Sequence, residues 1–149
     1  MNKITYKMRL PLTDIPRSDR DKVKEEVGNY LIEAILTEVG RGESPVKGGS
    51  WKRQLSPTYK KVKSKYSNKL IANMELHGDM LDSLEFKPTK SGVEVGIFDK
   101  SQVPKADGHN NFSGKSKLPE RRFIPKGDQK FKSDIINEIA SIITNHVKD

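Results

Sequence analysis

The side chains that most often carry catalysis or bind metals are few and scattered in this sequence. It has three histidines, His77, His109 and His146, and no cysteine. Common metal sites need three or four converging ligands, and no candidate pair stands four residues apart with a third ligand at hand. Ser50 and Ser83 lack an evident base, and the carboxylates show no acid–base pairing. We therefore expect a non-enzymatic protein with no catalytic residue, metal site or cofactor.

Basic and aromatic residues interleave between residues 47 and 66. Three rings, Trp51, Tyr59 and Tyr66, stand among seven cationic residues: Lys47, Lys52, Arg53, Lys60, Lys61, Lys63 and Lys65. Rings can stack on bases while lysines follow the phosphates of a nucleic acid strand. The alternative is that Tyr59, Val62 and Tyr66 form the buried stripe of a short helix, which their spacing favours. The basic side is exposed in both interpretations.

The net charge of +8 is concentrated in two stretches of the chain. Residues 41–75 hold nine Lys/Arg against two acids, and residues 100–132 hold nine against three. The remaining stretches are neutral or acidic. Clustered positive charge is typical of polyanion-binding surfaces, although a solvated loop has the same composition.

Length and hydropathy indicate a single soluble domain. The chain has 149 residues, and one core usually serves roughly 100–200 residues. Residues 1–6 lack the apolar core of a signal peptide, and no run approaches the roughly 20 apolar residues of a membrane span. We expect a protein made in the cytoplasm, without disulfides and without membrane contact.

Apolar periodicity predicts three strands and two long helices. Residues 4–10 alternate with a period of two, and residues 84–86 and 93–97 form a hairpin with a five-residue connection. Apolar stripes at spacings of three and four predict helices over residues 19–39 and about 128–147. The expected fold class is α+β, in which two long amphipathic helices pack on one face of a small antiparallel sheet.

The connections between these elements carry weaker signals. Ser56-Pro57 is typical of the start of a short helix, and another helical turn is expected around Met80 and Leu81. Residues 41–55 and 99–122 lack apolar periodicity and predict two long extended loops. A loop as long as residues 99–122 is uncommon in a compact domain unless it is functional or disordered.

Several short motifs follow one another between residues 44 and 125. They are residues 44–51 with 55–60, residues 76–84, residues 93–96, the set Ala106, His109, Phe112 and Gly114, and residues 119–125. In their order and spacing they resemble the phage virion morphogenesis and tail-completion family, which includes neck and minor tail proteins. The resemblance covers about two-thirds of the chain.

This resemblance implies a structural subunit of a tailed-phage virion. Such a subunit forms a homo-oligomeric ring, with six-fold symmetry favoured, around the DNA channel at the head–tail junction or upper tail end. Its partners would be neighbouring neck, connector and tail tube proteins, with transient contact to genomic DNA. Tail completion, tail terminator and neck adaptor remain alternatives.

Eight residues of the two long loops are expected to contact neighbouring subunits or channel DNA: Lys47, Trp51, Lys52, Arg53, Lys115, Lys117, Arg121 and Arg122. Phe123 is predicted to be the packing anchor where the second loop meets the last helix. An intrachain ion pair of Arg121 or Arg122 is an equal alternative. Two further hypotheses are a non-specific nucleic-acid-binding module that uses both basic stretches, and a small nuclease or toxin that uses His77 or His109.

Overall fold

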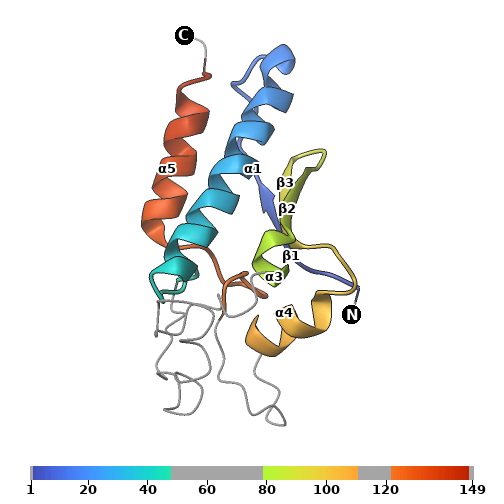
Figure 1. Ribbon diagram of the computed structural model, residues 1–149. Coiled ribbons are helices and arrows are strands. Elements are labelled where there is room, and N and C mark those ends of the chain that lie inside the picture. Colours follow the sequence, from blue (N-terminus) through green and yellow to red (C-terminus); the bar gives the residue numbers. More distant parts are fainter. Residues whose placement is uncertain (1, 48–78, 111–121, 148–149) are drawn as a thin grey trace.

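The computed structural model describes residues 2–47, 79–110 and 122–147 (Figure 1). The fold is α+β, as predicted: a small antiparallel sheet packed by helices. The elements in chain order are β1 (Ile4–Arg9), α1 (Arg17–Gly40), α3 (Asp79–Asp82), β2 (Leu84–Pro88), β3 (Gly92–Ile97), α4 (Val103–Asn110) and α5 (Ser133–Thr144).

The sheet has the strand order β1-β3-β2, so β1 and β2 are the two outer strands. Both are antiparallel to β3, with Ile4 and Leu84 each opposite Ile97. The outer strands therefore run in the same direction. The alternation along β1 buries Ile4 and Met8 on one face and leaves Lys7 exposed on the other.

Helix α1 packs across β2 and β3 on the face that carries these apolar side chains (Figure 1). Five α1 side chains four residues apart are completely buried: Val23, Val27, Leu31, Ile35 and Val39. Helix α5 lies beside α1 and buries Ile135, Ile139 and Ile143. Both helices thus pack in the core through the apolar stripes seen in the sequence.

The last helix is shorter than predicted. It begins at Ser133 rather than near residue 128 and has 12 residues, whereas α1 has 24. The residues before it are extended, because Lys47 N donates to Lys130 O and Lys132 N donates to Pro45 O. Gly127, with a φ of 63°, shapes the preceding turn.

Residues 99–122 are not one extended loop, which corrects the prediction. Helix α4 occupies Val103–Asn110, where Val103 and Ala106 are buried three residues apart. A turn precedes it, in which the Asp99 carboxylate accepts hydrogen bonds from the backbone N and the hydroxyl of Ser101. The predicted helix after Ser56 and most of the first loop lie outside the described residues.

Candidate interaction surfaces

Three of the nine residues singled out in the sequence lie in the described part of the chain. Lys47 is exposed, Arg122 is partly buried, and Phe123 is completely buried in the core. The other six lie outside the described residues: Trp51, Lys52, Arg53, Lys115, Lys117 and Arg121.

Arg122 makes hydrogen bonds within the chain. Its Nε donates to Asn110 O at 3.0 Å, and its Nη1 donates to Gln129 Oε1 at 2.7 Å. These two partners are a carbonyl and an amide oxygen of its own chain. The guanidinium thus joins the end of α4 to the turn before α5.

Asn110, at the end of α4, also binds the segment that precedes α5. Its side chain is 2% exposed, and its Oδ1 accepts hydrogen bonds from Phe123 N and Ile124 N, both at 2.9 Å. Its Nδ2 donates to Ile124 O at 3.1 Å. Ser44 Oγ donates to Arg122 O at 2.6 Å. Segments from three parts of the chain are therefore fixed at one end of the molecule.

The two segments outside the described residues both connect at this end. The described elements that flank them, the end of α1 and α3 for one segment and α4 for the other, lie in the lower half of the described structure in Figure 1. Residues 48–78 hold seven Lys/Arg and one Glu, and residues 111–121 hold three Lys/Arg and one Glu. Their combined surplus equals the net charge of +8, so the rest of the chain is neutral.

The sheet face opposite α1 and α5, here called the open face, carries further cations. Strand alternation places Lys7 and Arg9 of β1 and Lys87 of β2 on it. Lys87 Nζ lies 4.3 Å from the centroid of the Phe98 ring, a cation–π distance. The described residues place no carboxylate within ion-pair distance of Lys7 or Arg9.

Glu94 is a buried acid on the open face. Thr5 Oγ1 donates to its Oε2 at 2.6 Å, and Lys3 Nζ lies 2.8 Å from the same oxygen. Burial would raise the pKa of Glu94, but the hydrogen bonds from Lys3 and Thr5 and the charges of Lys3 and Lys7 lower it below its usual value. The carboxylate is thus ionised at neutral pH and compensates Lys3.

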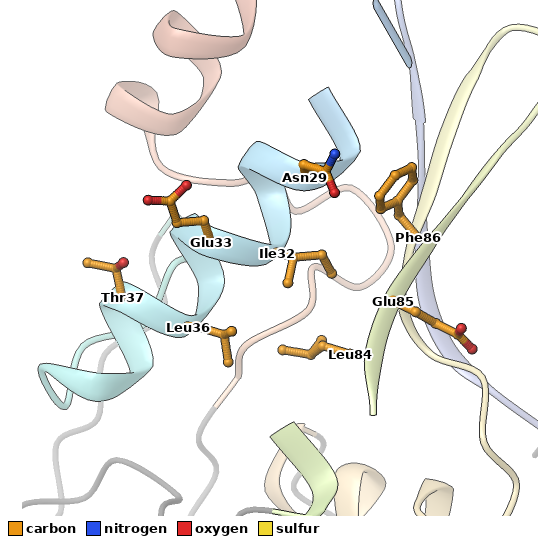
Figure 2. Close-up of a pocket in the computed structure, with 8 residues that line it drawn as sticks. All are labelled: Asn29, Ile32, Glu33, Leu36, Thr37, Leu84, Glu85 and Phe86. Atoms are coloured by element: carbon orange, nitrogen blue, oxygen red, sulfur yellow. The ribbon is translucent and has the colours of Figure 1, made fainter. Parts of the chain in front are cut away.

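An apolar groove, here called the β2-edge groove, runs between α1 and the outer edge of β2 (Figure 2). Its volume is about 650 Å³, and it is lined by Asn29, Ile32, Glu33, Leu36, Thr37, Leu84, Glu85 and Phe86. Leu36 is 40% exposed. Every charged residue of this lining is acidic.

Two hollows border the opposite edge of the sheet, along β1. One of about 510 Å³ separates β1 from α5, and its charged residues are Lys7, Arg9 and Lys130. The other, of about 410 Å³, separates β1 from residues 124–127, and its charged residues are Lys3, Lys7 and Lys126. We call them the β1-edge hollows. Their charged residues are all basic.

Neither a metal site nor a membrane span emerges within the described ranges. They contain no cluster of three His, Cys, Asp or Glu that could hold a metal ion. None of their helices is long and apolar enough to cross a membrane. His146 Nε2 lies 3.0 Å from Glu26 Oε2 and joins the end of α5 to α1, while His77 and the side chain of His109 lie outside the description.

The chain matches no protein-family model, no curated protein and no solved structure. The resemblance to phage tail-completion proteins therefore stays a prediction from the motifs.

Proposed function

We propose that this protein is a structural, non-enzymatic subunit of a tailed-phage virion, which forms a ring around the DNA channel at the head–tail junction or upper tail end. The observation that carries the proposal is a sheet whose two outer strands, among the described residues, each have an unpaired edge bordered by a groove or hollow. An open strand edge is a ready site for pairing with another chain. A subunit with a different edge on each side suits repeated side-by-side assembly.

Two different edges on one subunit are compatible with a closed ring. Two unlike surfaces on one subunit form a heterologous contact, which generates a ring when the rotation closes. The order of the sequence motifs between residues 44 and 125 supports a virion subunit. The partners would then be further copies of the chain, with a hexamer favoured, and the neighbouring neck, connector and tail tube proteins.

The charge distribution supports a channel through which DNA passes. The two basic segments connect at one end of a subunit that is otherwise neutral, and Lys7 and Arg9 add cations on the open face. Lysine and arginine can hold phosphates without reading bases. Contacts of this kind suit a genome that must slide past the protein.

Disruption of the gene in the producing phage tests the proposal. Electron microscopy of lysates should show filled heads beside unjoined tails. Tails of normal length would indicate a completion or neck protein, whereas overgrown tails would indicate a terminator. A plasmid copy of the gene should restore joined particles, and the same copy with an early stop codon should not. Normal infectious particles after disruption would overturn the proposal.

A second candidate function, a non-specific nucleic-acid-binding module, is favoured by the two basic segments. It predicts that the purified protein binds DNA or RNA at low salt and releases it as salt rises, because each phosphate contact releases counterions. The slope of log K against log salt concentration reports the number of such contacts. No binding at low salt would remove this candidate.

A further inference from the structure

We infer that the β2-edge groove of one copy receives the β1 edge of a second copy, so that the sheet continues from subunit to subunit. This inference rests on the proposed function, since it names the contact by which the ring forms. Its occupant is a second copy of this chain, and three features of the described residues argue for that choice.

The first feature is the backbone of the outer strands. All the strand pairing of β1 and of β2 in the described part of the chain is with β3. Among these residues, no backbone hydrogen bond runs from the outer side of either strand to another segment. Such an edge presents alternating N–H and C=O groups, which a further strand can satisfy.

The second feature is apolar surface beside both edges. In the β2-edge groove, Ile32 and Leu36 of α1 face Leu84 and Phe86 of β2 (Figure 2). The hollow between β1 and α5 is lined by apolar side chains that include Tyr6, Pro11, Ile136 and Ala140. Pairing of the two edges would remove apolar surface on the helix-covered side from water, which stabilises association.

The third feature is charge, which favours pairing of a β2 edge with a β1 edge. The β2-edge groove offers only acids, Glu33 and Glu85, whereas the β1-edge hollows offer only cations. Glu85 points away from α1 (Figure 2), on the side of the sheet where Lys7 and Arg9 lie. Glu33 lies on the helix side, as does Lys130. Opposite charges therefore meet where Glu85 faces Lys7 and Arg9 and where Glu33 faces Lys130, while Lys87 of β2 is engaged with the Phe98 ring. Pairing of two β1 edges would place only cations together.

The strand directions fit a rotation. Because β1 and β2 run in the same direction, a neighbouring copy produced by rotation about an axis roughly along the strands would pair its β1 parallel to β2 of the first copy. The helices would then stay on one side of the shared sheet. Heterologous contacts of this kind repeat from copy to copy.

Cysteine cross-linking tests the contact directly, because the chain has no native cysteine. A chain with Glu85→Cys and Lys7→Cys carries one thiol on each outer strand, and a short thiol-reactive cross-linker should give a ladder of dimers, trimers and larger species. Each single-cysteine chain should give largely uncross-linked chains on a denaturing gel. Dimers from Glu85→Cys alone would indicate that two β2 edges pair. Absence of the ladder, at a concentration where the double-cysteine chain is associated by sedimentation velocity, would mean that the copies do not meet at these two edges. Either outcome overturns the inference.

Charge reversal provides an independent test. Variant A carries Glu33→Lys and Glu85→Lys, and variant B carries Lys7→Glu and Lys130→Glu. Each alone should self-associate at least about tenfold more weakly than the native chain, because like charges then meet. An equimolar mixture of A and B should recover association, since every contact between the two variants again pairs opposite charges. Sedimentation velocity measures both effects.

The matched control is Asp14→Lys with Glu138→Lys, which makes the same charge change at exposed positions outside the groove and hollows. Its association should equal that of the native chain. A mixture of A and B that stays as weak as its components would overturn the inference, even if gene disruption still separates heads from tails. Conversely, the mixture of A and B could recover association while disruption of the gene still gives normal particles. That result would overturn the proposed virion role and support the edge contact.

Discussion

Lys132 Nζ lies 2.7 Å from Glu38 Oε2 and thereby ties the residue before α5 to the last turn of α1. The Glu38 side chain is 11% exposed, and Glu43 lies 3.5 Å from the same ammonium group. Burial would lower the pKa of Lys132, but its hydrogen bond to Glu38 and the charges of Glu38 and Glu43 outweigh burial and raise it.

Lys132→Met should therefore lower the free energy of unfolding at neutral pH by about 1–3 kcal/mol, because Glu38 loses its closest cation. Since the folded-state pKa of Lys132 is raised, its contribution is fully present below the ordinary value of 10.5 and is lost as pH rises through the folded value. Urea denaturation at neutral and strongly alkaline pH should show the difference between variant and native chain shrinking. Lys22→Met, at an exposed position of α1 outside the groove and hollows, should change little; equal losses in both variants would contradict the prediction.

Glu94 should make the protein sensitive to acid. Its pKa is lowered in the folded state, so its contribution is present above the ordinary value of 4.5 and is lost as pH falls through the folded value. In Glu94→Gln, the free energy of unfolding should depend less on pH in this acidic range. Glu25→Gln, an exposed acid of α1 outside the groove and hollows, is the control. Identical acid profiles for the native chain and Glu94→Gln would show that Lys3 and Thr5 do not stabilise the charge.

Asn110→Ala should destabilise the junction of α4 with residues 123–124 by about 3 kcal/mol or more. It removes three hydrogen bonds and leaves two backbone N–H groups and one carbonyl buried without partners. Hydrogen exchange should accelerate at the Phe123 and Ile124 amides, and urea denaturation should report the loss of stability. Asn137→Ala on the exposed side of α5 is the control, with an expected change within about 0.5 kcal/mol. Unchanged protection of both amides would contradict the assignment.

Gly28→Ala should destabilise the protein although alanine favours a helix. A Cβ at Gly28 would stand 2.2–2.4 Å from ring atoms of Phe86, and such overpacking costs about 1–3 kcal/mol against a helix-propensity gain of about 1 kcal/mol. In a Phe86→Leu background, the same substitution should be neutral or stabilising. A double-mutant cycle measured by urea denaturation tests the coupling. Simple additivity would mean that the ring is not the obstacle.

Sequence patterns predicted the elements whose apolar residues repeat many times. Helix α1 has five buried residues at regular spacing, which predicts a helix and not a strand. Strand β1 alternates over its whole length, which predicts a strand and not a helix. Helix α4 was missed because Val103 and Ala106 are its buried apolar residues and the next buried position is polar Asn110. The start of α5 was placed too early because nothing local reveals that residues 130–132 pair with residues 45–47.

The surfaces were harder to predict because they arise between distant segments. The β2-edge groove requires Leu36 to stand near Leu84 and Phe86, and periodicity does not say which strand a helix crosses. Lys7 and Arg9 alternate with buried residues and therefore look like an ordinary solvated strand face. Arg122 was associated with a partner surface, and its hydrogen bonds to Asn110 and Gln129 of its own chain could not be predicted from the sequence pattern.

The shared direction of β1 and β2 has a consequence for a ring whose symmetry axis runs roughly along these strands. Every subunit would present the turn at residues 89–91 and the start of α1 at one rim, and α3, α4 and the attachment points of both basic segments at the other (Figure 1). The assembly would thus have polarity, with different elements at its two rims. A component that fits the rim formed by α3 and α4 would not fit the other rim, and this difference would determine which neighbour of the ring joins at which end.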